Sequence, residues 1–240
     1  MSSISDFIRK AHHSFCTVVV VAAGSSTRMG KDKLMLSLCG VPILARTLTA
    51  LNGCQAVDEI IVVTKQEKLE EVSGLRETYA LDKLKKIVIG GSTRTESALA
   101  GVSEADRRAK IICIHDGVRP FVTNEIVQDV VHYAVLYNAA APALPVKDTI
   151  KRAKDGVVLE TPDRSELFAV QTPQAFHADI IKGALTKAVN AGTSYTDDCA
   201  AVEAFGVPIY LSRGDEDNIK ITTPSDLFLA ESIQRGRSAE

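Results

Sequence analysis

Two apolar runs, at 18–21 and 111–114, restrict the fold of this chain more than any other feature of its sequence. The first is Val-Val-Val-Val and the second is Ile-Ile-Cys-Ile, with no polar residue in either. A strand with one face in water alternates apolar and polar residues, so these runs indicate strands that are covered on both faces. Such strands are typical of parallel sheets packed between two layers of helices.

The rest of the chain fits this interpretation, because short β-branched runs alternate with segments of helical spacing. Strands are expected at 17–21, 59–64, 86–89, 111–115, 139–144 and 208–211. Helices are expected at 42–51, 92–104, 123–137, 178–189 and 197–205, and from 223 onward, with Thr196 capping the fifth and Gly206 ending it. This order predicts an α/β fold with a mostly parallel, twisted sheet, helices on both faces and right-handed crossovers.

One stretch interrupts the alternation. Segments 148–152 and 156–160 read as two short polar strands around Asp155-Gly156, a strong hairpin signal. Because this hairpin is too polar for the core, we expect 146–170 to project as a β-arm onto a second subunit. The expected organisation is a leader at 1–15 followed by one domain at 16–240.

Composition excludes several classes of protein. The net charge of −2 and the absence of Trp argue against a nucleic-acid partner. Apolar runs stay well short of the ~20 residues of a membrane span, so no membrane partner is expected. The five cysteines are odd in number and form no CxxC pair, which indicates free thiols and a cytoplasmic location.

The first strand runs directly into "AAGSSTRMGKDK", 22–33. Small residues at the end of a parallel strand allow backbone N–H groups to approach a phosphate or a base, and Arg28 and Lys33 can then contact phosphate oxygens. A dinucleotide fingerprint fails because Ser26 stands where its second Gly belongs, and a P-loop fails because Asp32 follows Lys31. Considered without the other segments, 22–33 could equally be a turn whose basic side chains are solvated and bind no phosphate.

Similar signals follow the later strands. "GGSTRTES" at 90–97 offers another close-approach turn at the start of a helix, with Arg94 in solvent as the plain alternative. In "HDGVRP", Asp116 falls at a strand end suited to a hard cation, and Arg119 can brace the loop. His115 is expected to be a satisfied core residue. By itself, Lys220 would be a surface residue.

Taken together, the segments "AAGSSTRMGKDK", "GGSTRTES", "HDGVRPF", "DTIKR", "QTPQAF" and "DNIKITTPSDL" resemble the 2-C-methyl-D-erythritol 4-phosphate cytidylyltransferases, in the same order and from about residue 18 to residue 229. The resemblance implies a Rossmann-like nucleotidyltransferase fold and a homodimer. It also implies transfer of CMP from CTP to a sugar-alcohol phosphate in isoprenoid precursor synthesis, with Mg²⁺ and release of pyrophosphate.

The resemblance also implies roles for individual residues. Arg28, Lys33 and Lys220 would be catalytic, the first two on the triphosphate and Lys220 on the α-phosphate, with Lys31 as the alternative to Lys33. The nucleotide would contact Ala22, Ala23, Gly24, Gly91, Ser92, Ser97 and Gly117. Asp116 would hold the metal ion, and Thr149 and Arg164, on the arm, would bind the sugar phosphate in the neighbouring subunit.

Three other interpretations remain open at this stage. A ribitol 5-phosphate cytidylyltransferase shares most of these motifs and would differ mainly around Thr149 and Arg164. A non-catalytic nucleotide-binding domain would be expected to lose at least one of Arg28, Asp116 and Lys220, and all three are present. A nicotinamide-dependent oxidoreductase is disfavoured by the missing second Gly.

Overall fold

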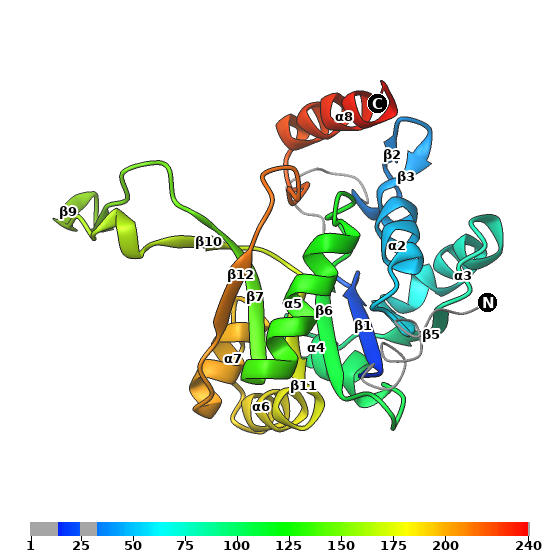
Figure 1. Cartoon of the computed structure of the whole chain (residues 1–240), viewed down its shortest axis with the longest axis horizontal. Helices are drawn as coiled ribbons and strands as arrows, with labels where there is room; N and C mark the ends of the chain where they lie inside the picture. The colour runs from blue at the N-terminus through cyan, green and yellow to red at the C-terminus, as the bar shows by residue number, and fades with distance from the viewer. Residues whose placement is uncertain (1–13, 25–32, 240) are drawn as a thin grey trace, which may run out of the picture.

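The structure is a computed structural model that describes residues 14–24 and 33–239 (Figure 1). Its strands are β1 Cys16–Val21, β2 Ser37–Leu38, β3 Val41–Pro42, β4 Glu59–Thr64, β5 Leu84–Ile89, β6 Ile111–Asp116, β7 Ala139–Pro145, β8 Arg152–Lys154, β9 Val157–Glu160, β10 Phe168–Val170, β11 Gln174–His177 and β12 Tyr210–Arg213. Its α-helices are α2 Ile43–Gly53, α3 Leu69–Thr78, α4 Arg94–Ser103, α5 Asn124–Tyr137, α6 Ala178–Asn190, α7 Asp198–Phe205 and α8 Pro224–Ala239. Short 3₁₀ turns occupy Lys33–Met35, Gln66–Lys68 and Arg164–Glu166.

A central sheet organises the described part of the chain. Its order is β10-β7-β11-β6-β1-β4-β5, with β12 on the other edge of β7. The β1–β4, β1–β6, β4–β5 and β7–β12 pairs are parallel, whereas β11 runs antiparallel to β6 and β7. The expected α/β fold with a mostly parallel sheet is confirmed.

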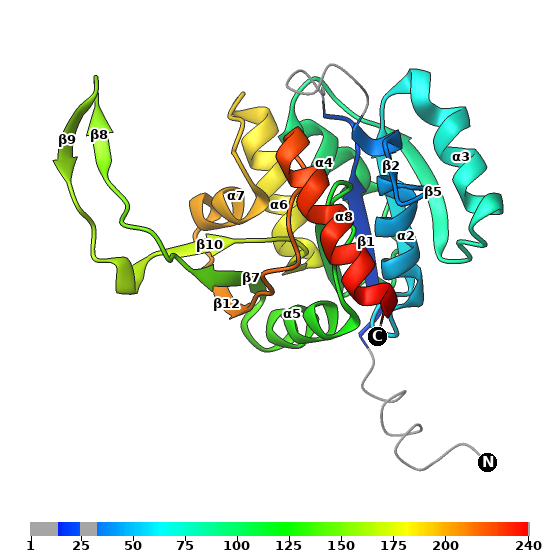
Figure 2. The same ribbon diagram turned by 90° about the horizontal axis from the view of Figure 1, so that it is seen from above.

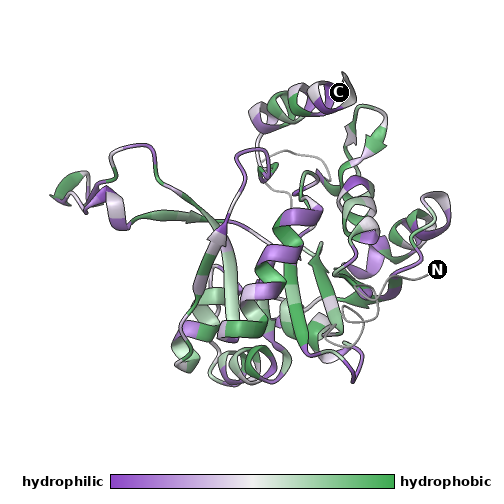
Figure 3. Cartoon of the chain, viewed as in Figure 1, coloured by the Kyte–Doolittle hydropathy of each residue, from purple (hydrophilic) through white to green (hydrophobic). Residues whose placement is uncertain are grey.

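Helices cover both faces of this sheet, which explains the apolar runs. Val18 and Val20 point into a cluster with α2, α3 and α5, whereas Val19 points into a second cluster with α4, α6 and α7. Successive side chains of a strand alternate between faces, so a strand between two helix layers needs apolar residues at every position. The central strands are accordingly the most hydrophobic part of the drawing (Figure 3).

Helix α8 belongs to neither of these layers. Ile221 and Ala230 pack with Leu38, Ile43 and Phe121 in a small separate cluster over β2 and α2. Figure 2 shows α8 lying across the top of the body. This packing anchors the chain immediately after Lys220. None of the helices in the described segments has the length and apolar character required to cross a bilayer.

Most of the expected arm, residues 146–167, reaches away from the body, and its hairpin β8–β9 contacts solvent on all sides (Figure 2). The last residues of the expected arm, in β10, instead pair antiparallel with β7 in the central sheet. Asp155 and Gly156 have φ angles of 51° and 79° at the turn, as expected for a two-residue Asp-Gly hairpin. The expectation of two polar strands is wrong for β9, which consists mainly of apolar residues. Its Val157, Val158 and Leu159 are nevertheless 65%, 54% and 52% exposed.

Several boundaries differ from the sequence-based expectations. The first hairpin strand begins at Arg152 rather than at 148, and α4 begins at Arg94 because Thr93 forms its N-cap. Helix α7 is capped by Asp197, whose side chain accepts from the Ala200 amide, and not by Thr196. Gly206, with a φ of 98°, ends α7 as expected.

Candidate active site

The carboxyl ends of β1, β4, β5 and β6 meet at one edge of the sheet. Val21 and Asp116 are register partners, and the Gly117 amide donates to the Val21 carbonyl over 3.1 Å. The Gly90 amide donates to the Thr64 carbonyl over 2.8 Å. Because parallel strands deliver their ends together, the segments 22–24, 90–97 and 116–119 lie together at the edge where open α/β sheets form their ligand crevice.

Gly90 is needed where two of these segments touch. A Cβ at this position would lie 2.7 Å from Cβ of Ala23 and 2.8 Å from Oγ of Ser97. Both distances are shorter than a real Cβ contact, so only glycine allows this approach. The residues expected to hold the nucleotide, Ala22, Ala23, Gly91 and Ser97, are therefore brought together.

The start of α4 is built by a capping box. The Thr93 hydroxyl accepts from the Glu96 amide, and the Glu96 carboxylate accepts from the Thr93 amide. The same carboxylate accepts from both the amide and the hydroxyl of Ser92, at 2.6 and 2.5 Å. Ser92 is thus held by Glu96, while the buried Ser97 donates to the Thr93 carbonyl.

Asp116 lies at the centre of the charged groups in the crevice. Its Oδ2 lies 3.0 Å from Nζ of Lys220 and 3.4 Å from Nε of Arg119. The structure describes no contact for its Oδ1. Only 10% of the Asp116 side chain is exposed, whereas 44% of the Lys220 side chain is exposed, so the ion pair is buried on the carboxylate side and open on the ammonium side.

The cations decide the ionisation of Asp116. Burial would raise the pKa of this carboxyl, but Lys220, Arg119 and Arg94 together outweigh burial and hold the pKa below its usual value. Asp116 is therefore a carboxylate at neutral pH, as a ligand for a hard cation must be.

His115, directly before Asp116, is a structural residue. It is fully buried, with Nδ1 3.0 Å from the Thr172 hydroxyl and Nε2 3.2 Å from the Arg119 carbonyl. Burial lowers its pKa to about 4. The ring is neutral near pH 7 and both nitrogens are engaged, so the expectation of a satisfied core histidine is confirmed.

Arg94 is not solvated, contrary to the plainest expectation from sequence. Its Nη2 donates to Oδ2 of Asp198 over 2.6 Å, and Asp198 is 1% exposed. Burial raises the pKa of the Asp198 carboxyl, and Arg94 opposes this rise. Oδ1 of Asp198 has no hydrogen-bond partner in the described part of the chain. Arg94 therefore links the nucleotide-side helix α4 to α7.

The structure does not bring all the expected site residues together. Arg28 and Lys31 lie outside the described residues, and Lys33 opens a short 3₁₀ turn after them. Gly24 is exposed at the end of the described loop. Thr149 and Arg164 are exposed on the arm, where Arg164 donates to the Lys147 carbonyl over 2.8 Å rather than contacting Asp116 or Lys220.

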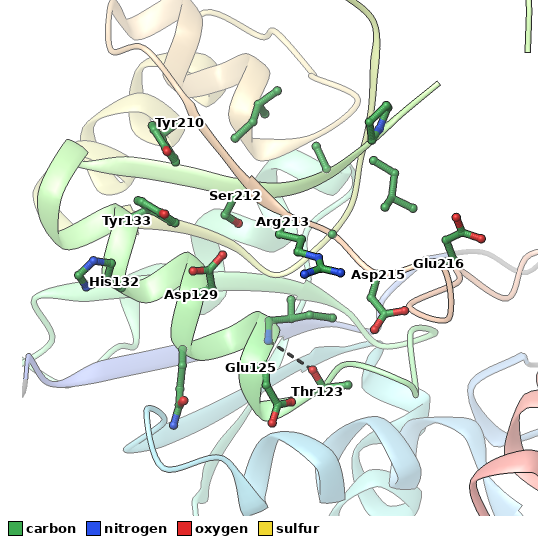
Figure 4. Close-up of a pocket in the computed structure, with 17 residues that line it drawn as sticks. Thr123, Glu125, Asp129, His132, Tyr133, Tyr210, Ser212, Arg213, Asp215 and Glu216 are labelled. Atoms are coloured by element: carbon green, nitrogen blue, oxygen red, sulfur yellow. Dashed lines mark hydrogen bonds between the residues drawn. The ribbon is translucent and has the colours of Figure 1, made fainter. Parts of the chain in front are cut away.

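A cavity of about 1150 Å³ lies elsewhere, between α5 and the β7–β12 edge. Figure 4 shows Tyr133 and Tyr210 at one end of it, and their rings stack with centroids 4.3 Å apart. Asp129, Arg213 and Glu216 also line this cavity, but Asp116 and Lys220 do not. It borders the loop before Lys220 without being part of the crevice.

Sequence reasoning did not single out Thr172, Asp198 or Asn218. Thr172 accepts from the Asp116 amide over 3.1 Å, and the Asn218 carbonyl accepts from Nη1 of Arg119 over 2.6 Å. These contacts join segments that are distant along the chain. The motifs "QTPQAF" and "DNIKITTPSDL" contain Thr172 and Asn218, whereas Asp198 lies in neither. A single sequence has no signal for which of these residues meet.

Comparison with known proteins agrees with this geometry. The family model of 2-C-methyl-D-erythritol 4-phosphate cytidylyltransferase matches residues 16–236. Curated proteins with that name from Caldanaerobacter subterraneus and Clostridium novyi are 45% and 44% identical, over 91% and 90% of this chain and 98% and 94% of their own. The crystal structure of 4-diphosphocytidyl-2C-methyl-D-erythritol synthase from Anaerococcus prevotii is 29% identical with a TM-score of 0.84, covering 93% of this chain and 99% of that one. The Thermus thermophilus cytidylyltransferase is 30% identical with a TM-score of 0.75, covering 90% and 98%.

Proposed function

The chain belongs to the 2-C-methyl-D-erythritol 4-phosphate cytidylyltransferase family, and on this basis we propose that it transfers CMP from CTP to 2-C-methyl-D-erythritol 4-phosphate. The products are 4-diphosphocytidyl-2-C-methyl-D-erythritol and pyrophosphate, in isoprenoid precursor synthesis. The observation that carries this proposal is the Asp116–Lys220 ion pair at the crevice, with Arg119 and Arg94 around it.

The chemistry requires charge compensation more than proton transfer. The attacking phosphate and the α-phosphate of CTP are both anionic and must approach in line with the departing pyrophosphate. Lys220 faces the α-phosphate, while Lys33 and Arg28 hold the triphosphate; positioning and electrostatic stabilisation then lower the barrier. A phosphate monoester is already an anionic nucleophile near neutral pH, so no general base is needed. The neutral, fully engaged ring of His115 is consistent with this.

The nucleotide lies against the small residues at the strand ends. Its cytidine is held by the 90–97 turn and its ribose by Gly117. The contacting residues are Ala22, Ala23, Gly24, Gly91, Ser92, Ser97 and Gly117. The close approach at Gly90 supports this assignment, because it opens backbone groups of both loops to one ligand.

Mg²⁺ fits Asp116. No group of three or more His, Cys, Asp or Glu side chains that could hold a metal occurs in the described residues, so a site made wholly of protein ligands is not supported there. Mg²⁺ is usually held by one or two carboxylates together with substrate phosphates. Among the described residues, the contacts of the ionised Asp116 involve Oδ2, so Oδ1 would be available to such an ion. The ion would add positive charge to the phosphates.

The acceptor phosphate is bound by Thr149 and Arg164 of a second subunit. In the described chain these residues stand on the projecting arm, away from their own Asp116, and the arm exposes Val157, Val158 and Leu159. An arm that packs on a partner would cover these side chains and complete the partner's crevice. A cytoplasmic homodimer without nucleic-acid or membrane partners is therefore proposed.

The experiment that tests this function is product identification. The protein is incubated with CTP, Mg²⁺ and 2-C-methyl-D-erythritol 4-phosphate, and the nucleotide products are resolved by mass spectrometry. The proposal requires the diphosphocytidyl sugar alcohol to appear together with pyrophosphate, and only when the acceptor is present. Bound CTP without any such product would instead support a nucleotide-binding regulatory domain.

A further inference from the structure

Asn218 is completely buried in the loop that precedes Lys220. Its Nδ2 donates to the Thr172 carbonyl over 2.9 Å and to Oε1 of Gln171 over 3.3 Å. Its Oδ1 has no hydrogen-bond partner within the described residues. A buried amide with an unpaired oxygen costs free energy that an apolar side chain would avoid, so the two donor bonds account for the amide at this position.

Gln171 holds the other end of the same loop. Its Nε2 donates to the Asp215 carbonyl over 2.7 Å, and its Oε1 accepts from the Asp215 amide over 3.2 Å. The backbone N–H of Asn218 in turn donates to the Asp215 carbonyl over 3.1 Å. The loop 214–218 is thus bound to the 171–172 turn through both of its ends.

The backbone around Asn218 contacts the Asp116 loop as well. The Asn218 carbonyl accepts from Nη1 of Arg119, and the Ile221 amide donates to the Val118 carbonyl over 3.0 Å. Lys220 therefore lies in the chain between Asn218, which is hydrogen-bonded to the Arg119 side chain, and Ile221, which is hydrogen-bonded to the Val118 backbone. Thr172, which Asn218 contacts, also accepts from the Asp116 amide.

From these contacts we propose that Asn218 is a positioning residue for the transfer reaction. It holds Lys220 and Arg119 in place beside Asp116. This inference rests on the proposed function. The side-chain amide of Asn218 holds the 171–172 turn and its carbonyl holds Arg119, so the three segments of the crevice keep one relative placement. Asn218 acts through these groups and touches no substrate.

Two substitutions separate this role from general stability. Asn218→Ala removes both donor bonds and keeps the backbone carbonyl that binds Arg119. Asn218→Asp keeps the size of the side chain and places a carboxylate oxygen, in the position of Nδ2, against the Thr172 carbonyl and Oε1 of Gln171. When the introduced carboxyl is protonated it can again donate one hydrogen bond, and burial without a donor raises its pKa.

The expected result is a loss of turnover rather than of nucleotide binding. Asn218→Ala lowers kcat by about tenfold or more, the scale of one buried hydrogen bond left unmade, while the Kd for CTP changes by less than about threefold. For Asn218→Asp, the ratio of its kcat to that of the wild type rises as the pH falls from 8 to 6. The ratio is used because Arg119, which contacts the Asn218 carbonyl, and the nearby Asp215, Asp217 and Lys220 of the same loop are present in both proteins.

Thr17→Val is the matched control. Thr17 is also fully buried, and its hydroxyl donates to Oε2 of Glu59 over 2.7 Å at the opposite end of β1. This variant loses a buried hydrogen bond and thermal stability, but its kcat measured well below the melting temperature stays at the wild-type value. Gln171→Met removes one acceptor of Asn218 and both hydrogen bonds between Gln171 and Asp215, so it is also expected to lower kcat.

The outcomes distinguish the two levels of the account. If the wild type is active and folded Asn218→Ala has an unchanged kcat, the positioning role alone is overturned. The same holds if the wild type is active and the kcat ratio of Asn218→Asp to the wild type does not depend on pH. If Asn218→Ala does not fold, an unchanged kcat in Gln171→Met together with a pH-independent ratio overturns it. A wild-type protein that binds CTP but transfers nothing overturns the proposed function and the positioning role together.

Discussion

Lys220 and Asp116 form an ion pair of 3.0 Å although they come from the loop before α8 and from the end of β6. The carboxylate is buried and the ammonium is partly open to the crevice. A buried carboxylate with a cationic partner nearby remains ionised. This pair therefore places an ammonium group beside an ionised carboxylate, and the proposed reaction uses both.

Removing either member of the pair is expected to abolish most turnover. Lys220→Ala and Asp116→Ala each lower kcat by about a hundredfold or more, since each removes a charge that acts in the transition state. Steady-state pyrophosphate release measures the effect, and circular dichroism shows that the fold survives. Lys86→Ala is the control, because Lys86, on β5, forms an exposed ion pair with Glu104 at the end of α4. Near-normal turnover in either site variant would contradict the assigned roles.

Arg164 is predicted to act on the acceptor and not on CTP. Arg164→Ala raises the KM for the sugar phosphate by about tenfold or more, the scale of a lost hydrogen bond to a charged group. The Kd for CTP stays close to the wild-type value. Arg152→Ala, on the same arm but paired with Glu160, serves as the control and leaves both constants unchanged. Weaker CTP binding with an unaltered acceptor KM would reverse the assignment.

Gly90→Ala tests the approach of the two nucleotide loops. The added Cβ would lie 2.7 Å from Cβ of Ala23, so the loops must separate. Such overpacking costs about 1 to 3 kcal/mol, and we expect the Kd for CTP to rise by about tenfold or more. Calorimetry of CTP binding measures this change. Gly74→Ala, where an added Cβ meets nothing within 4 Å, is the control and leaves CTP binding intact. Equal CTP affinities of the wild type, Gly90→Ala and Gly74→Ala would contradict the close approach of Gly90 to Ala23.

The Arg94–Asp198 pair is predicted to make stability depend on pH once it is broken. Arg94→Met leaves a carboxylate that is 1% exposed without its cation, a loss of about 3 kcal/mol near pH 7. The pKa of Asp198, already raised by burial, then rises further. The folded state binds a proton that the unfolded chain releases above its pKa of about 3.9, so stability falls as pH rises and recovers as pH falls.

Urea unfolding at pH 5 and at pH 8 tests this prediction. The deficit of Arg94→Met relative to the wild type is expected to be smaller at pH 5. Arg235→Met, which breaks an exposed pair with Glu231, should show a small deficit that is the same at both pH values. A deficit for Arg94→Met that does not change with pH would show that Asp198 is not the group involved.

The sequence predicted the parts of the fold that local patterns determine. The unbroken apolar run at 18–21 identified a strand buried on both faces, and Asp155-Gly156 identified the hairpin turn by its need for two positive φ angles. Helix α3 was not predicted, because only Val72 and Leu75 are buried in it and its apolar face is weak. Strand β11 was also not predicted; it fits between β6 and β7 by antiparallel pairing, which no local pattern requires.

For the site, sequence identified the strand-end residues but not their partners. Asp116 was placed correctly at the end of β6, since a parallel strand delivers its last residues to the crevice. The Arg94–Asp198 pair and the Asn218 contacts join elements that meet only in the folded chain. Contacts of this kind depend on the packing of several elements and leave no periodic trace in the sequence.

The most direct test of the account is a competition between two acceptors. The protein is given CTP, Mg²⁺ and equal concentrations of 2-C-methyl-D-erythritol 4-phosphate and ribitol 5-phosphate, and initial rates of both products are measured. The account predicts that the diphosphocytidyl methylerythritol product forms and that the ribitol product is negligible. Predominant formation of the ribitol product would preserve the CTP site and its mechanism but contradict the proposed acceptor.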